Sequence, residues 1–211
     1  MHWAVLSDYW PAILHGLSVT IQITIVAALG ALCIGVLIGC LHQTRSYALR
    51  RVIDAYVELI RNVPAIVKVF FLYFVLGWEG MESAIVGLAI HQSAYICDAV
   101  DAGFRSIPKE QSEAAWALGH SRSEVFIHVL LPQTWAVSMP SITNQLIEVL
   151  KNSSIVMLIG VQELTFQAQQ IESDTFRGFE AATAVTAIYV TLAFGIAWLA
   201  HRFEQRMSRS K

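Results

Sequence analysis

The chain has 211 residues, of which 55% are hydrophobic and 14% are charged, and its mean hydropathy is +0.54. A soluble domain normally carries charge on about a quarter of its residues, so this composition indicates a protein that lies in a membrane. The formal net charge of −2 provides no excess of cations for phosphate groups and argues against a nucleic-acid partner.

The N-terminal part predicts an interfacial segment followed by a membrane span. Residues 1–16 contain aromatic residues but no Lys or Arg, which excludes a secretory signal and favours an amphipathic segment anchored at the membrane interface. Residues 17–41 carry no charge and are long enough to span the membrane as a helix. Small residues recur in this span at a spacing that permits close packing inside one subunit: Ala31, Gly35 and Gly39.

The second and third predicted spans cover residues 52–77 and 84–104, after a basic loop at 42–51. Pro64 removes a backbone hydrogen bond within the second span and predicts a kink or break there. Ionisable residues in these spans each cost about 2.5–3.5 kcal/mol at a helix centre, so they need a partner or water. On the third span the polar residues share one face: His91, Tyr95, Asp98 and Asp101.

A polar island at residues 108–133 predicts two short helices. Pro108 suits a first helical position, and Gly119 accepts the left-handed conformation that ends a helix. A Ser-x-x-Glu capping box at residues 121–124 begins the second helix, which we expect to end before Pro132. The apolar residues of this second helix fall on one face: Val125, Phe126, Val129 and Leu130.

The fourth and fifth predicted spans cover residues 138–161 and 184–200 and are joined by a polar loop at 162–182. The tail after residue 200 is basic. The first half of the fourth span carries polar residues at helical spacing: Ser141, Asn144, Gln145, Glu148, Lys151 and Asn152.

Cations are distributed unevenly between the two sides of these five spans. One side carries ten cations, whereas the other side carries only Arg177. Cytoplasmic loops are enriched in Lys and Arg, so we expect the N-terminus outside, and the polar island and the C-terminus in the cytoplasm. The ten cations are Arg45, Arg50, Arg51, Arg105, Lys109, Arg122, Arg202, Arg206, Arg209 and Lys211.

Motifs for catalysis by this chain are missing from its sequence. There is no GxxxxGK[ST] loop to hold ATP phosphates, no GxG dinucleotide signature and no histidine cluster with metal-ligand spacing. We therefore predict that the chain is not an enzyme and binds no cofactor or metal itself.

The polar island resembles the EAA loop of ABC-importer membrane subunits through Glu113-Ala114-Ala115, Gly119, Phe126 and Leu131-Pro132-Gln133. In that family the loop is a coupling helix that docks into a cleft on a separate ATPase dimer, which binds ATP and Mg²⁺. The resemblance implies that residues 105–134 form the coupling loop. The implied ATPase-coupling residues are Glu113, Ala114, Ala115, Gly119, Phe126 and Pro132.

Further motifs extend the resemblance over nearly the whole chain, and it is closest to permeases for polar amino acids. These motifs are Gly16 with Thr20, Arg61-Asn62-Val63-Pro64, Ala94-Tyr95, Gln111-Ser112-Glu113-Ala114-Ala115 and Lys151-Asn152-Ser153-Ser154. They imply one all-α domain over residues 1–211, with five transmembrane helices in the ABC type I importer permease fold. The implied partners in a bacterial inner membrane are lipid, an identical or sibling permease subunit, the ATPase dimer and a periplasmic or lipid-anchored solute-binding protein.

The polar residues inside the spans have two interpretations. They could pair only with one another, as Glu148 and Lys151 would at i, i+3, or they could line a hydrated path for a polar solute. The Arg-Asn-Val-Pro and Lys-Asn-Ser motifs resemble those of glutamate/aspartate permeases, whereas Asp101 stands where the family often has Arg and favours neutral or cationic solutes. The predicted path residues are Arg61, Tyr95, Asp98, Asp101, Asn144, Glu148 and Lys151.

The predicted function is therefore that of a permease subunit, half of a dimeric pore, in an ATP-driven importer for polar amino acids. The two motifs outweigh the single Asp101 substitution, so glutamate or aspartate is the solute expected within this class. One alternative is a non-transporting membrane scaffold that recruits a cytoplasmic partner, but a scaffold has no reason to bury polar faces. A standalone secondary transporter is a third alternative, and it would normally have a second inverted half.

Overall fold

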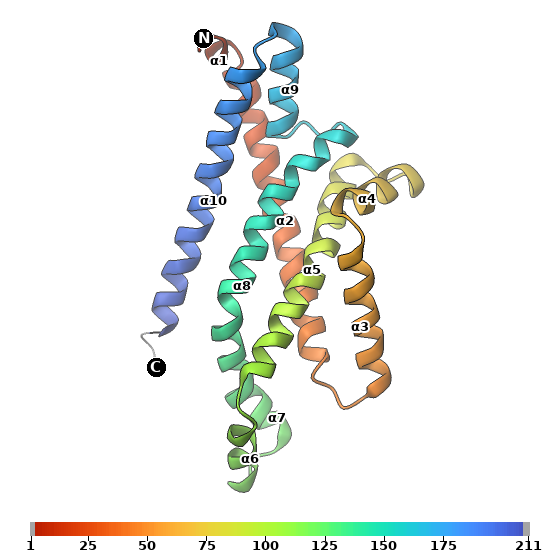
Figure 1. Cartoon of the computed structure of the whole chain (residues 1–211), viewed down its shortest axis with the longest axis vertical. Helices are drawn as coiled ribbons and strands as arrows, with labels where there is room; N and C mark the ends of the chain where they lie inside the picture. Colours follow the sequence, from red (N-terminus) through yellow and green to blue (C-terminus); the bar gives the residue numbers. More distant parts are fainter. Residues whose placement is uncertain (1–2, 209–211) are drawn as a thin grey trace.

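The computed structural model describes residues 3–208, and within this range the chain forms helices only (Figure 1). Two of the counted cations, Arg209 and Lys211, lie outside the described residues. Four helices are long and apolar enough to cross a membrane, and a shorter apolar helix at Ala65–Val75 belongs to the second predicted span. The four long helices are Trp10–Leu41, Gly80–Ser106, Arg122–Ile159 and Gly178–Arg202.

The centre of the bundle is the crossing of α2 (Trp10–Leu41) and α5 (Gly80–Ser106). Small residues make this crossing close, because a Cβ at Gly35 would lie 2.6 Å from the Ser93 carbonyl oxygen, and one at Gly39 would lie 2.8 Å from Val100 Cβ. Ala31 is fully buried in the same interface. The predicted use of the small-residue repeat, packing inside one subunit, is confirmed.

The second span is broken at Pro64, as predicted. Helix α3 (Tyr47–Asn62) ends at Val63, whose backbone is extended, and α4 (Ala65–Phe70) begins after Pro64 and runs into the π-helix η1 (Phe71–Val75). Lys68 Nζ donates to the carbonyl oxygens of Ile60, at 2.8 Å, and of Val63. The ammonium group thus satisfies carbonyl groups that the break leaves without helical partners.

The polar island begins as predicted but ends differently. Helix α6 (Lys109–Ala117) has Pro108 at its N-cap, one position before the predicted one, and Gly119 has a φ of +89°. The predicted capping box opens α7 (Arg122–Glu124). The expectation that this helix ends before Pro132 is wrong, because the chain continues through η2 (Val125–Leu130) into α8 (Leu131–Asn152). Segment η2 is a π-helix, whose wider turn lets the chain pass the proline without a break.

The remaining elements correct two sequence expectations. The predicted loop at 162–182 contains a helix, α9 (Leu164–Thr175), which follows the 3₁₀-helix η3 (Ser153–Ile159) and precedes α10 (Gly178–Ser208). Among the described residues of the predicted interfacial segment 1–16, α1 (Val5–Asp8) leads directly into the first long helix, which begins at Trp10 rather than at residue 17. Its Pro11 lies in the first turn of α2, where a proline costs no hydrogen bond.

The N-cap of α9 explains why this helix forms. The carboxylate of Glu163 accepts the N–H groups of Thr165 and Phe166, each at 2.8 Å, and the hydroxyl of Tyr189 on α10 donates to it at 2.7 Å. Glu163 is fully buried, so its charge is taken up by donors rather than by water. The cap therefore also fastens α9 to α10.

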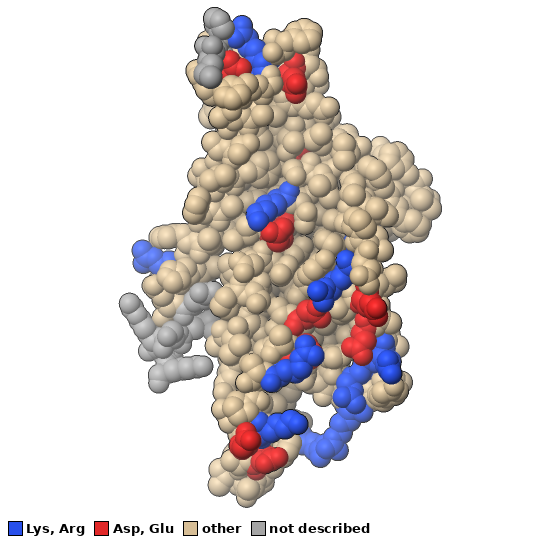
Figure 2. All heavy atoms as spheres, in the orientation of Figure 1, with Lys and Arg blue, Asp and Glu red and all other residues tan. Residues whose placement is uncertain are grey.

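The connections gather at two opposite ends of the bundle. The α2–α3 connection and the α6–α7 loop lie toward one end, whereas the N-terminus and α9 lie at the other (Figure 1). Figure 2 shows many Lys and Arg side chains toward the end that holds α6, and few at the opposite end. The chain path thus brings together the basic segments that the sequence assigned to one side.

We predict that the α2–α5 crossing tolerates no added side chain. Gly35→Ala would drive a Cβ against the Ser93 carbonyl oxygen and Ile96, and overpacking of this kind typically costs about 1–3 kcal/mol. The melting temperature of the purified protein in detergent should therefore fall. Gly195→Ala on α10 is the matched control, because nothing lies within 4 Å of its added Cβ. Equal melting temperatures for the two variants would contradict the close crossing.

Candidate polar cavity and coupling loop

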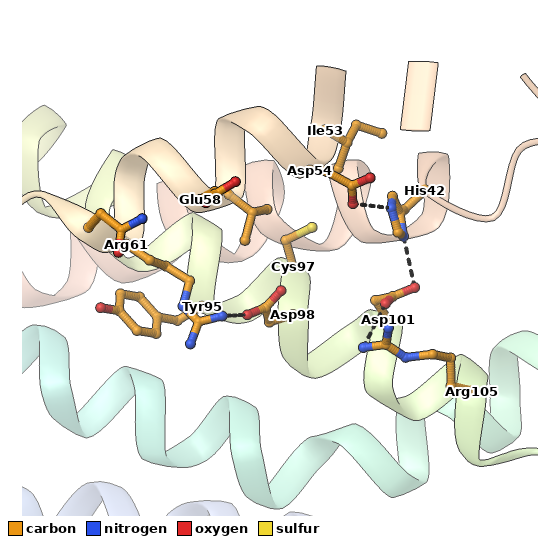
Figure 3. Close-up of a pocket in the computed structure, with 12 residues that line it drawn as sticks. His42, Ile53, Asp54, Glu58, Arg61, Tyr95, Cys97, Asp98, Asp101 and Arg105 are labelled. Carbon is orange, nitrogen blue, oxygen red and sulfur yellow. Dashed lines mark hydrogen bonds and ion pairs between the residues drawn. The ribbon is translucent and has the colours of Figure 1, made fainter. Parts of the chain in front are cut away.

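A polar cavity of about 500 Å³ opens between α3, α5 and the C-terminal end of α2 (Figure 3). It holds four of the seven residues that the sequence predicts for a solute path: Arg61, Tyr95, Asp98 and Asp101. Its remaining polar lining residues are His42, Asp54, Glu58, Asn62, Cys97 and Arg105. Four carboxylates therefore face two guanidinium groups, so the cavity has an acidic balance.

The cation of Arg61 is already engaged in this cavity. Its guanidinium forms an ion pair with Asp98 on α5 and lies over the ring of Tyr95, 5.2 Å from the centroid. Arg61 belongs to the last turn of α3, where a cation is favourable beside the free carbonyl ends of a helix. The ion pair thus ties the end of α3 to the middle of α5.

Asp101 is held by several donors at the other end of the cavity. This residue is only 7% exposed, and it accepts hydrogen bonds from Gln43 Nε2 at 2.8 Å and from Arg105 at 2.9 Å. His42 Nδ1 lies 2.9 Å from the same carboxylate, and His42 Nε2 lies 2.9 Å from Asp54 on α3. A buried carboxylate with three partners is stable as a charged group.

Sequence reasoning missed the partners of Asp101. Gln43 and His42 lie 58 and 59 residues before it in the chain, and only the folded α2–α5 crossing brings them together. Arg105 lies one helical turn after Asp101, and this i, i+4 spacing was a signal in the sequence that could have revealed the pair.

The other three predicted path residues form a separate cluster on α8. Glu148 and Lys151 make an ion pair at 2.7 Å, the pairing expected from their spacing, and Asn144 is exposed. Lys151 also borders a second cavity, of about 290 Å³, between α8, α9 and α10. The buried Gln92 on α5 donates to Gln145 on α8. The structure therefore divides the predicted path into two clusters on adjacent helices.

The predicted coupling residues have unequal exposure. Glu113, Ala114 and Gly119 are exposed, whereas Ala115 is 8% exposed and points into the loop. Two large apolar side chains on α6 and just after it also face outward, since Trp116 is 47% and Leu118 is 81% exposed. An exposed apolar surface beside a charged residue is typical of a protein-docking site.

The rest of the loop attaches this surface to the membrane helices. The ring of Phe126 stacks on Phe104 near the end of α5, with centroids 5.4 Å apart, and Val125 is 1% exposed. Pro132 lies exposed in the first turn of α8. Segment η2, which follows the α6–α7 loop and runs into α8, is therefore packed against the end of α5.

Among the described residues, no group of three or more His, Cys, Asp or Glu side chains is placed to hold an ion. Six ionisable groups of the polar cavity are paired with one another: His42, Asp54, Arg61, Asp98, Asp101 and Arg105.

Comparison with known proteins shows the family of the chain. Residues 9–209 match the family described as "Binding-protein-dependent transport system inner membrane component". The glutamine transport system permease protein GlnP of Escherichia coli (strain K12) is 33% identical, over 95% of this chain and 96% of its own length. The probable glutamine ABC transporter permease protein GlnM of Bacillus subtilis (strain 168) is 30% identical, over the full length of both chains.

A solved structure shares the fold. A chain from the crystal structure of an amino acid ABC transporter with histidines superposes with a TM-score of 0.90, at 29% identity, over 98% of this chain and 99% of its own. The predicted all-α architecture of an ABC type I importer permease is confirmed, and the chain is a transport subunit rather than an enzyme. Because the family match covers nearly its whole length, the chain belongs to the inner membrane components of binding-protein-dependent transport systems.

Proposed function

We propose that this subunit forms half of a dimeric pore that imports polar amino acids at the expense of ATP. The observation that carries the proposal is the pair of charged clusters on α5 and α8, inside helices long enough to cross a membrane. Charged groups inside membrane helices are costly unless they are paired or hydrated, and where they occur they commonly mark the path of a polar solute. The similarity to the glutamine permease GlnP and the probable glutamine permease GlnM supports an amino acid as the solute.

The proposed mechanism passes through the α6–α7 loop. Closure of a cytoplasmic ATPase dimer, which binds ATP and Mg²⁺, pushes on the exposed surface around Glu113, Ala114 and Leu118. Because Phe126 stacks on Phe104, the loop moves together with the ends of α5 and α8. Those two helices carry the two charged clusters, so the displacement changes the path itself.

The remaining partners follow from the same proposal. A second permease subunit, identical or a sibling, completes the pore, and a periplasmic or lipid-anchored binding protein delivers the solute. The distribution of cations supports a bacterial inner-membrane orientation with the N-terminus outside and the C-terminus in the cytoplasm. A non-transporting scaffold is the alternative of another class, and the buried carboxylate of Asp101 with its donors argues against it.

For the solute we favour a zwitterion with a neutral polar side chain, such as glutamine. The cavity has an acidic balance, and Arg61 and Lys151 are both paired with carboxylates. The second candidate is glutamate or aspartate, which the Arg-Asn-Val-Pro and Lys-Asn-Ser motifs favour. An acidic side chain would have to displace Asp98 from Arg61 or Glu148 from Lys151.

Replacing Gly119 with Val should uncouple ATP hydrolysis from uptake in vesicles that contain the complete complex. The φ of +89° costs a residue with a side chain about 1–2 kcal/mol or more, so the turn between α6 and α7 would rearrange while the membrane helices stay inserted. The control is Ala117→Val, which adds the same side chain to the exposed surface of α6. Normal uptake per ATP hydrolysed by the Gly119 variant would refute the coupling role.

The orientation is tested by labelling single cysteines in intact cells. In a version lacking Cys33, Cys40 and Cys97, Ser123→Cys should react only with membrane-permeant thiol reagents. Ser173→Cys should also react with impermeant ones, because the two exposed serines lie at opposite ends of the bundle. The reverse pattern would overturn the orientation and the docking of an ATPase on α6.

The solute is tested by competition for uptake into reconstituted vesicles. We expect glutamine to compete best, and we expect Asp98→Asn to improve glutamate relative to glutamine by releasing Arg61. The ratio should change roughly two- to fivefold, because a partly exposed ion pair contributes up to about 1 kcal/mol.

The matched control for this experiment is Glu58→Gln, which removes the same charge from the same cavity but leaves the Arg61–Asp98 pair in place. Strongest competition by glutamate in the unmodified protein would select the second candidate. Uptake of arginine alone would contradict both, and competition by no amino acid would refute the solute class.

A further inference from the structure

The imidazole of His42 joins three segments at one end of the polar cavity. It is the first residue after α2, and its ring lies between Asp54 on α3 and Asp101 on α5, 2.9 Å from a carboxylate oxygen on each side (Figure 3). A neutral imidazole carries only one N–H, so its second nitrogen would direct a lone pair at a carboxylate oxygen. Only the protonated ring donates to both carboxylates.

The surroundings of His42 favour the proton. The cavity that His42 borders is also lined by Cys97, Asp98 and Arg105 on α5 and by Glu58 on α3. Burial lowers the pKa of the imidazole, but the hydrogen bonds and charges of Asp101 and Asp54 outweigh burial and raise the pKa above its ordinary value.

The His42 contact lies in the main interface of α3. This helix packs chiefly against α5, where Tyr56 and Ser93 share a hydrogen bond of 2.6 Å and Arg61 pairs with Asp98. A change at Asp54, about two helical turns before Arg61 on the same helix, therefore bears on the position of Arg61 inside the cavity.

We propose that His42, Asp54 and Asp101 form a proton-dependent clasp that holds α3 against α5 and thereby positions Arg61. The clasp positions a residue of the proposed solute path, but its own contacts need no transport cycle, and only its exposure to cytosolic pH rests on the proposed orientation. It makes the position of α3 a function of pH.

The direction of the pH effect follows from the raised pKa. The closed clasp binds the proton more tightly than the open one, so its stabilisation is complete below the ordinary pKa of histidine, about 6.5. That stabilisation is lost as the pH rises through the raised pKa of the closed form. Alkaline conditions therefore release α3 from α5, and acidic conditions hold the two helices together.

The test measures the distance between α3 and α5 directly. Spin labels are placed at the exposed positions Ala55 and Ala102, in a cysteine-free version of the complete complex. Distances are recorded at pH 6, below the ordinary histidine pKa of about 6.5, and at pH 8.5, about two units above it. The unmodified clasp should give a narrow distribution at the lower pH and a longer or broader one at the higher pH.

Three variants test whether the clasp causes this pH response. His42→Gln should give the same distribution at both pH values, whereas the control His15→Gln, at an exposed histidine elsewhere, should keep the full response. Asp54→Asn should also abolish it, and the Asp54 side chain is 57% exposed, so this change leaves the buried contacts of Asp101 intact.

Two outcomes would overturn the clasp: a distance independent of pH in the unmodified protein, or an unchanged pH response in either His42→Gln or Asp54→Asn. The measurement uses neither ATP nor an amino acid. A negative result in the distance measurement would therefore refute the clasp without affecting the transport proposal. A negative result in the uptake experiments would refute transport without affecting the clasp.

Discussion

The arrangement of this subunit depends on ion pairs and hydrogen bonds between the charged side chains of its membrane helices. Arg61 pairs with Asp98 across the α3–α5 interface, and Asp101 collects three donors from α5 and the end of α2. Each group alone would cost several kcal/mol at that depth. The same pairs that make the charges tolerable also decide which helices lie together, so the polar cavity and the packing of α3 have one cause.

Backbone N–H and carbonyl groups in the membrane helices also need partners, as the charged side chains do. At Pro64 the helix breaks, and Lys68 supplies an ammonium donor to carbonyl groups of α3. At Pro132 the helix does not break, because the π-helical turns of η2 accommodate the proline. Two prolines thus give opposite results, and the difference lies in how the local hydrogen bonds are satisfied.

Local rules explain which parts the sequence could predict. The capping box at Ser121, the left-handed Gly119 and the break at Pro64 each depend on residues within one turn. Helix α9 was missed because its cap, Glu163, is stabilised by Tyr189 on another helix. The division of the predicted solute path into two clusters could not be predicted from the sequence either. Helical spacing shows which residues share one face of a helix, but not which faces of different helices pack together.

The two charged clusters, on α5 and α8, are connected by the loop that lies between these helices in the chain. In the chain, the α6–α7 loop lies between α5 and α8, and η2 connects it to α8. The Phe104–Phe126 stack packs η2 against the end of α5. In the proposed cycle, a push on the loop therefore shifts the Arg61–Asp98 cluster relative to the Glu148–Lys151 cluster. An amino acid carries an ammonium and a carboxylate, and it can replace one member of each pair in turn. Ion pairs that are partly exposed are weak enough to be exchanged in this way, whereas the buried contacts of Asp101 are not.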